Sequence, residues 1–393
     1  MDFINEAKNI QNELKEAQHY LHENAETGFD LRETVGYVIN KLNEYGYDPK
    51  VIGNNGVVAT AGKSGKTILL RADMDALPIT EETGLPYAAK NGNMHACGHD
   101  FHTAILLGAA KLLKLYENEL CGAVKLYFQP AEEIICGCQN SIDAGLMDGP
   151  PVDAAAALHV TGGKKDEADI LIKRGVTCAS CDHYKIIIKG RGSHGASPHD
   201  AIDPIVTGCH MVLTLQNITA REIDAQKPAV QTICKFAGGS AVNIIPESVE
   251  LLGTLRTLDD ASRQTCKRRI LEITELTAKT FGAEAELEWL ASVPPLKNDG
   301  AMTDAVEKYL RELDGIKISE SSEISMGSED FALIADRVPG VYFHLVCAGD
   351  ENGDHPNFHG PFVIFDDDML HIGAAAMAKI AFSWLTDNSK ECE

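Results

Sequence analysis

Basic residues are scarce in this sequence. Its 393 residues include 35 Lys and Arg but 58 Asp and Glu, which gives a formal net charge of −23 at pH 7. Nucleic acids and anionic membranes are bound through basic surfaces, so this balance argues against both as partners. At 44% hydrophobic and 24% charged residues, the composition is otherwise that of an ordinary globular protein.

Long apolar segments are lacking as well. Residues 1–26 are rich in Glu, Lys and Asn and contain no apolar core of a secretion signal. We find no run of about 18 apolar residues and therefore expect no membrane-spanning segment. The cysteines number eleven, an odd count, and without a secretion signal they favour free thiols in a cytoplasmic protein. Cys178 and Cys181 lie near His183 and could be a redox or metal pair, or two partly buried thiols at a domain boundary.

The length exceeds that of one ordinary domain, and two domains are predicted. Residues 1–46 suggest two helices, the second between about Asp30 and Gly46. Apolar strand-like runs follow, and they alternate with a helix over 104–115 that Asp100 could cap. These runs cover 56–61, 67–72, 123–129 and 154–160. The alternation predicts an α/β domain with a mostly parallel sheet.

A second domain is predicted as an insertion into the first. From about Asp182 the pattern becomes strand, helix, strand, strand, helix, strand, which is the split βαββαβ order of ferredoxin-like domains. Its predicted elements cover 183–189, 201–220, 230–237, 247–258, 260–281 and 285–290. Asp260 is the expected N-cap of the long helix, and Pro294-Pro295 marks the return. The first domain then comprises 1–181 and 292–393, and the inserted domain 182–291.

The segment from Met94 to Asp100 carries the clearest chemical signal. Cys97 and His99 offer a thiolate and an imidazole within three residues, and both bind borderline metals such as zinc well. A bare Cys-x-His is weak evidence. Further ligand-type residues strengthen it, because Glu133 follows one strand, His159 ends another and His359 lies near the C-terminus. Together they predict a metal-dependent hydrolase.

Acidic side chains follow two of the predicted strands. Asp73 and Asp75 come after the strand 67–72, and Glu132 and Glu133 follow the strand 123–129. Active sites of open α/β sheets gather at the carboxyl ends of the strands. Adjacent glutamates point different ways, so one can bind metal while its neighbour serves as general base. A solvated acidic turn is the alternative for this pair.

Other histidines compete for the same roles. His95 and His102 flank the Cys97–His99 pair, and supporting or helix-start roles suit them better than metal binding. His355 competes with His359, which we favour. In the inserted domain, His194, Asn243 and Arg256 could grip an oxyanion and a carboxylate. That list comes from residue type and spacing alone.

The chain resembles the amidohydrolase branch of the M20 metallopeptidase family, which includes hippurate hydrolases, N-acyl-amino-acid amidohydrolases and auxin-conjugate hydrolases. The matching motifs run in family order over nearly the whole chain. They are Leu70–Pro78, Met94–Asp100, Gln129–Glu133, Leu158–Val160, Gly192–His194, Asn243–Pro246, Gly253–Thr257 and Met326–Phe331.

The resemblance implies a dinuclear metal site and a lid. Cys97 would bridge the two ions, and Glu132 would be the general base and acid. His99, Glu133, His159 and His359 would complete the metal site, with Asp75 and Asp100 beside it. The inserted domain would be a lid and dimerisation domain, whose His194 reaches the partner subunit's site and steadies the oxyanion. Asn243 and Arg256 would help bind the substrate.

The implied reaction is hydrolysis of the amide bond of an N-acyl amino acid to a carboxylic acid and a free amino acid. Manganese or zinc would be the metal, with cobalt or nickel compatible, and the protein would be a homodimer. Two departures concern the substrate: Ile134–Cys138 stands where the branch runs through glycines, and Thr161-Gly162 where a Trp-Pro-like pair is common. A dipeptidase and a catalytically silent conjugate-binding relative remain as alternatives.

Overall fold

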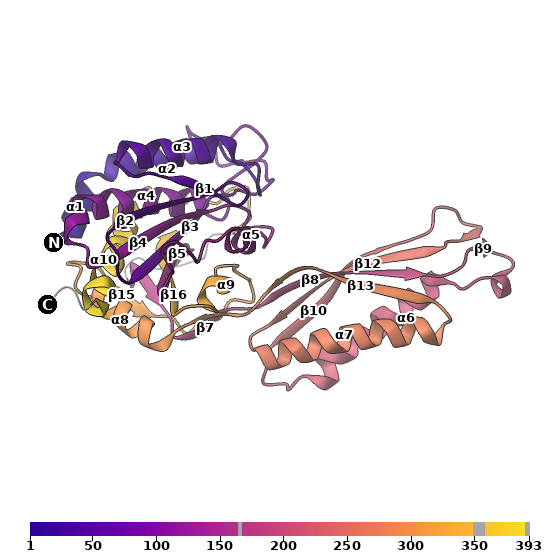
Figure 1. Cartoon of the computed structure of the whole chain (residues 1–393). Coiled ribbons are helices and arrows are strands. Elements are labelled where there is room, and N and C mark those ends of the chain that lie inside the picture. The colour runs from indigo at the N-terminus through magenta and orange to yellow at the C-terminus, as the bar shows by residue number, and fades with distance from the viewer. Residues whose placement is uncertain (164–166, 349–357, 390–393) are drawn as a thin grey trace. The chain divides into compact units, whose positions relative to one another are not determined.

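A computed structural model describes residues 1–163, 167–348 and 358–389 of the chain, which form two compact units (Figure 1). The first unit comprises Met1–Thr177, Lys297–Glu323 and Leu333–Glu393. The second comprises Cys178–Leu296 and Ile324–Ala332. The first unit is therefore built from three segments of the sequence and the second from two.

An eight-stranded mixed sheet forms the centre of the first unit. Its strand order is β1-β2-β4-β3-β5-β16-β6-β15, and the central strands β4, β3, β5 and β16 run parallel. This confirms the predicted α/β class. The strands are β1 Lys50–Ile52, β2 Gly56–Gly62, β3 Thr67–Asp73, β4 Ala123–Gln129, β5 Ala154–Gly162, β6 Ile170–Ile172, β15 Ile318–Glu320 and β16 Gly340–Ala348.

The central strands are buried on both faces. Every residue of β3 and β4 is buried, as parallel strands covered on both sides require. Parallel pairing aligns Asp73 at the end of β3 with Gln129 at the end of β4. The residues that follow these two strands therefore leave the sheet at the same edge.

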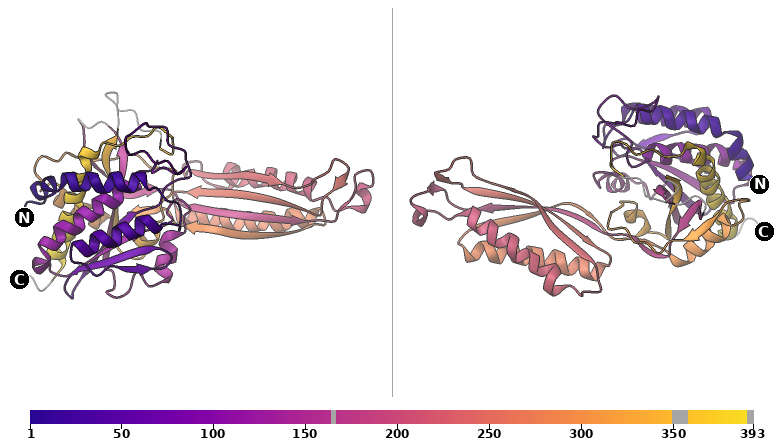
Figure 2. Two further views of the ribbon diagram at one scale, coloured as in Figure 1. Left: turned by 90° about the horizontal axis from the view of Figure 1, so that it is seen from above. Right: turned by 180° about the vertical axis from the view of Figure 1, so that it is seen from behind.

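Helices cover this sheet (Figures 1 and 2). The long helices α4 and α10 pack on each other and on β3. The helices of the first unit are α1 Phe3–Asn9, α2 Gln11–Glu23, α3 Arg32–Glu44, α4 His99–Leu115, α5 Gly137–Asp143, α8 Gly300–Leu310 and α10 Leu370–Asn388, with short helical turns at Glu117–Glu119 and Asp367–Met369. The short α9, Ala332–Ala335, begins at the boundary of the units.

Contrary to the expectation from the sequence, one helical segment among the described residues is long and apolar enough to cross a membrane by length and composition. It covers Asp367–Asn388, and 72% of its most apolar window is buried inside the structure. Its apolar residues pack against α4 and β3. Burial within the protein core therefore accounts for its composition.

The second unit has the predicted βαββαβ order. Its four-stranded antiparallel sheet is arranged β10-β12-β8-β13, and α6 and α7 pack on it. The elements are β8 Cys181–Lys189, β9 Ser193–His194, α6 Pro204–Asn217, β10 Ala229–Ala237, β11 Ile244–Ile245, β12 Ser248–Thr257, α7 Asp260–Thr280 and β13 Glu284–Val293, with short helical turns at Pro198–Asp200 and Ile218–Glu222. Two-stranded sheets join β9 to β11 and β7 (Gly175–Cys178) to β14 (Leu296–Asn298).

Three local predictions were wrong. The first predicted helix is two, α1 and α2, which separate at Ile10. Asp100 does not cap α4, because the helix begins at His99 and its N-cap is Gly98 in the left-handed conformation. The N-cap of α7 is Asp259, whose side chain accepts a hydrogen bond from the Ser262 N–H, and not Asp260.

Candidate metal centre

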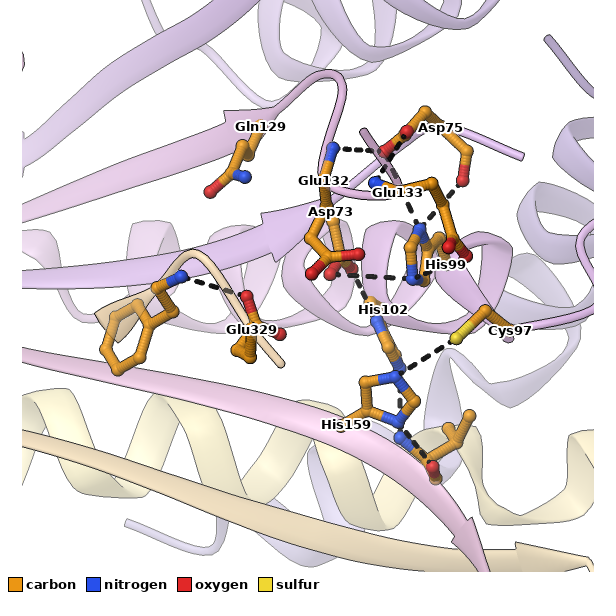
Figure 3. A network of polar contacts seen from close by, with 12 residues as sticks. Asp73, Asp75, Cys97, His99, His102, Gln129, Glu132, Glu133, His159 and Glu329 are labelled. Atoms are coloured by element: carbon orange, nitrogen blue, oxygen red, sulfur yellow. Dashed lines mark hydrogen bonds and ion pairs between the residues drawn. The ribbon is translucent and has the colours of Figure 1, made fainter. Parts of the chain in front are cut away.

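Side chains that can bind metal converge in the first unit beyond the carboxyl ends of the central strands (Figure 3). Several overlapping groups of described residues each bring one donor atom per residue within 4.8 Å of one another, and three of these groups consist of predicted site residues. These three groups are Cys97, His99 and His159; Cys97, Glu133 and His359; and His99, Glu132 and Glu133. Because Cys97 occurs in the first two groups, the geometry is that of two adjoining sites that share a thiol.

The donor atoms of these side chains lie close to one another. The Cys97 Sγ lies 3.4 Å from the His159 Nε2. The Glu133 Oε1 lies 3.8 Å from the His99 Nε2 and 3.7 Å from the His359 Nε2. These five side chains offer one sulfur, three nitrogens and carboxylate oxygens, a mixed set that suits zinc, manganese and related ions.

Backbone carbonyls orient two of the imidazoles. His99 donates its Nδ1–H to the Asp75 carbonyl at 2.7 Å. His159 donates its Nδ1–H to the Val160 carbonyl at 2.6 Å. In its neutral form each ring presents an unprotonated Nε2, as metal-bound histidines do. Burial alone would lower the pKa of His99, but Asp73 raises it well above its usual value, so binding a cation there would displace a proton. The His99 Nε2 and the Glu133 Oε1 are buried and have no hydrogen-bond partner among the described residues, so a bound cation would satisfy both atoms.

Asp75 fixes the two glutamates. Its Oδ1 accepts a hydrogen bond from the Glu132 N–H at 2.9 Å, and its Oδ2 accepts one from the Glu133 N–H at 3.1 Å. The chain reaches these residues through Ala131, whose φ is +55°. Asp75 therefore holds the backbone of both glutamates while their carboxylates remain available for chemistry.

Asp73 organises the layer beneath the donors. It accepts hydrogen bonds from Arg71 at 2.7 Å and from the His102 Nδ1–H at 2.5 Å. Burial alone would raise the pKa of Asp73, but Arg71, His99 and His102 hold it well below its usual value. The His102 Nε2 accepts the Val160 N–H at 2.9 Å, so His102 has no ring nitrogen left for a metal.

Burial shifts the titration of several donors toward their neutral forms. It raises the pKa of the Cys97 thiol and of Glu133, and it lowers the pKa of His159 well below its usual value. A thiol must lose its proton to bind metal. Cys97 would therefore be a thiolate only when positive charge lies beside it.

His359 reaches the cluster from the C-terminal part of the chain. Its backbone has a φ of +62°, and its N–H donates to the Ala96 carbonyl at 3.1 Å. This bond ties His359 to the segment that carries Cys97 and His99. The competing His355 lies outside the described residues.

Asp100 faces a different set of side chains. Its Oδ2 accepts hydrogen bonds from His22 at 2.8 Å and from Gln18 at 2.5 Å. His22 also contacts Glu81 at 3.1 Å. Sequence reasoning gave no role to Gln18, His22 or Glu81, because nothing in the sequence joins α2 to the segment before α4.

The second unit brings together only part of its predicted set. His194 and Asn243 adjoin, since the Gly195 N–H donates to the Asn243 carbonyl at 2.8 Å, and His194 is exposed. A shallow pocket of about 410 Å³ lies beside them, lined by Gly192–His194 and Ile244–Glu247. Arg256 is near the other end of β12, where it donates to the Thr254 hydroxyl.

The length of β12 separates Arg256 widely from the His194 and Asn243 end of the second unit. β12 pairs with β8 from Ser248 opposite Lys189 to Leu255 opposite Asp182. At about 3.3 Å per residue, Ser248 and Arg256 are roughly 26 Å apart along the strand. One small molecule could not touch both His194 and Arg256 of the same chain.

Comparison with known proteins shows matches over most of the chain. Residues 69–383 match peptidase family M20/M25/M40. An N-acetyl-L-cysteine deacetylase from Bacillus subtilis is 38% identical over 89% of this chain and 84% of its own length. A hippurate hydrolase from Campylobacter jejuni is 37% identical over 98% of this chain and 100% of its own length.

A solved structure shares the architecture. A dinuclear metal-binding peptidase of family M20 from Bacillus subtilis superposes with a TM-score of 0.79 at 34% identity, covering 96% of this chain and 99% of that protein. The two proteins therefore share the same fold over nearly their whole lengths.

Proposed function

The chain belongs to peptidase family M20/M25/M40, and on that premise we propose that it is a metal-dependent amidohydrolase that cleaves N-acyl amino acids. The observation that carries this proposal is the cluster of five metal-binding side chains with Glu132 beside it. The deacetylase and the hippurate hydrolase to which it is similar are named for substrates of this class.

The metal centre that we propose holds two divalent ions, manganese or zinc, with cobalt or nickel also compatible. Cys97 would bridge them, and the remaining ligands would be His99, Glu133, His159 and His359. Bound there, the ions would acidify a water and polarise the substrate carbonyl. The orphaned His99 Nε2 and Glu133 Oε1 support this assignment.

Glu132 is the proposed general base and acid. Its carboxylate lies within 4.8 Å of the donor atoms of His99 and Glu133, and its backbone is fixed by Asp75. It would take a proton from the attacking water as the new C–O bond forms. It would then give that proton to the amide nitrogen as the C–N bond breaks, which releases a carboxylic acid and an amino acid.

The inserted domain, proposed as residues 182–291, would act as lid and dimerisation domain. His194 would stabilise the oxyanion, and Asn243 and Arg256 would bind the substrate, Arg256 through its carboxylate. The roughly 26 Å between the two ends of β12 supports a homodimer in which His194 serves the partner subunit's site. Lid closure would then be part of turnover.

Ile134 is the proposed contact for the substrate's acyl group. It follows Glu133 directly, and although it is large and apolar it is 50% exposed. A site for small molecules is commonly lined by apolar side chains with few polar groups. Ile134→Gly should therefore change the ratio of kcat/KM for benzoyl and acetyl substrates, whereas Val51→Ala, a change to an exposed residue on β1, should not.

A panel of N-acetyl, N-benzoyl and long-chain acyl amino acids, with dipeptides, tests the function. The protein would be stripped with a chelator and resupplied with manganese, zinc or cobalt. Metal-dependent release of amino acid supports the proposal. Cleavage of dipeptides alone would favour a dipeptidase, and metal binding without any cleavage would favour a conjugate-binding protein. The proposed location is the cytoplasm, with small molecules and no nucleic acid as partners.

A further inference from the structure

A buried polar cluster adjoins the Met94–Asp100 segment. This histidine–carboxylate cluster consists of Gln18 and His22 of α2, Glu81, His95 and Asp100. His22 bridges Asp100 and Glu81 at 2.8 and 3.1 Å, and the Gln18 Nε2 donates to the Asp100 Oδ2 at 2.5 Å. The rings of His22 and His95 are 6.4 Å apart between centroids.

Four polar atoms of this cluster are orphaned. The Asp100 Oδ1, the Gln18 Oε1 and both ring nitrogens of His95 are buried and have no hydrogen-bond partner among the described residues. Each of the three side chains belongs to a residue that is 1% exposed. Buried polar atoms of native proteins are nearly always satisfied, by protein or by ordered water.

Three of the four orphaned atoms, one from each side chain, match the bonding capacity of one water molecule. A water donates two hydrogen bonds and accepts up to two, and buried waters typically make about three. The Asp100 and Gln18 oxygens can only accept, whereas a neutral imidazole carries one N–H donor. Two donated bonds and one accepted bond would satisfy the Asp100 Oδ1, the Gln18 Oε1 and the N–H of His95, one atom of each side chain.

We propose that a buried water joins Gln18, His95 and Asp100, and that His95 is thereby a positioning residue for Cys97 and His99. His95 precedes these residues by two and four positions. The His95 carbonyl accepts the Gly98 N–H at 3.2 Å, and the Ala96 carbonyl accepts the His359 N–H. Through His95, the water would hold the Met94–Asp100 segment in place. Because Gln18 belongs to α2, the water would also connect this segment to α2.

This inference rests on the proposed metal centre, and metal affinity tests it independently of catalysis. The affinity of the full-length protein for Co²⁺ would be measured by competition with a chromophoric chelator. Partners that orient ligands typically contribute about 10- to 100-fold in affinity. His95→Leu and Gln18→Leu should therefore each weaken binding at least about tenfold, although Gln18 is remote from the ligands in sequence.

The Co²⁺ affinity of the double variant His95→Leu/Gln18→Leu distinguishes a shared water from two independent structural disturbances. If one water joins both side chains, the double variant should lose little more affinity than the weaker-binding single variant, because changes in one network are not additive. His95→Gln, which keeps a donor and an acceptor, should restore most of the loss. His371→Leu, a control on α10, should leave the affinity unchanged.

Unchanged affinity in both single variants, or losses that multiply in the double variant, would overturn the proposal. If the variants do not fold, a crystal structure of the wild-type protein tests the proposal instead. An ordered water between Gln18, His95 and Asp100 would support the proposal. Direct contact between these side chains, or an empty space without water, would contradict it. If wild-type protein binds metal but cleaves nothing, the proposed function fails while the affinities still test the water.

Discussion

His99 and His159 each commit one ring nitrogen to a backbone carbonyl and direct the other at the shared cluster. Asp75 uses both carboxylate oxygens to fix the backbone of Glu132 and Glu133. Such partners restrict the metal-binding atoms before any ion arrives, and losing them typically costs about 10- to 100-fold in affinity or activity. At the residue scale, the residues that orient the ligands therefore contribute to metal affinity and activity nearly as much as the ligands do.

Gly98 offers a sharp test of this view. It lies between Cys97 and His99 with a φ of +84°, and a Cβ there would lie 2.3 Å from the Val160 Cγ2. We expect Gly98→Ala to destabilise the protein by about 1–3 kcal/mol and to weaken Co²⁺ binding. Urea unfolding and chelator competition measure the two effects.

Gly92 is the matched control. Its φ is +85°, but no atom lies within 4 Å of its would-be Cβ. Gly92→Ala should therefore show only the backbone strain of a left-handed alanine, with normal metal binding. Equal metal affinity in the two variants would contradict the proposed importance of the Gly98 contact.

His22 predicts a pH dependence of stability. Burial lowers its pKa, but Asp100 and Glu81 raise it to about 10 in the folded protein, from an ordinary value of 6.5. Between these values the folded state keeps a proton that the unfolded chain releases. The stabilisation is therefore complete below pH 6.5 and falls as the pH rises to 10, by about 1.4 kcal/mol per pH unit where the states differ by one proton.

Urea unfolding of metal-free protein at pH 6 and pH 9 measures this effect. The free energy of unfolding of the wild-type protein should fall more steeply with pH than that of His22→Gln, whose amide cannot titrate. Parallel pH profiles for the two proteins would show that His22 is not held in its charged form.

At the scale of elements, the sequence predicted four of the eight strands of the first sheet, β2 to β5, and the order of the inserted domain. Apolar runs identified these strands, because strands buried on both faces are rich in apolar residues; the nine-residue β16 was not assigned. Short strands such as β1, β6 and β15 have three residues each and carry too little pattern to be recognised. The break between α1 and α2 at Ile10 was missed for the same reason.

Much of the candidate site could be predicted because parallel strands end at one edge, which places the ligands Glu133 and His159 near the supporting residue Asp75. The other supporting residues could not be predicted with equal ease. Gln18 and His22 come from α2, and their contacts with Asp100 span about 80 residues of sequence that no local pattern connects. The burial of His102 behind Asp73 likewise depends on packing.

The length of β12 leads to a prediction about assembly. If His194 serves the partner subunit's site, Glu132→Gln and His194→Ala should each be nearly inactive alone but should complement each other in mixed dimers. Each mixed dimer would hold one intact site, so random exchange of subunits should restore about a quarter of wild-type activity. Activity that stays at the sum of the two variants would show that His194 acts within its own chain.

For the whole molecule, the amino-acid composition restricts the possible partners but does not determine the fold. A net charge of −23 is a statement about partners, not about the fold. The assignment of residues 324–332 to the second unit was not foreseen, because it depends on contacts distant in sequence. Family membership comes from motifs spread over nearly the whole chain, and their combined order is far more specific than any one of them.

The central claim is that this chain hydrolyses an amide bond with Glu132 as the group that moves the proton. The most direct test compares the wild-type protein with Glu132→Gln, both loaded with the same metal, on the best N-acyl amino acid of the panel, with metal content measured for each. General acid–base catalysis is typically worth about 10²- to 10⁴-fold. We predict a loss of kcat in that range with two ions still bound; a variant that keeps full activity, or a wild type without metal-dependent cleavage, would contradict the account.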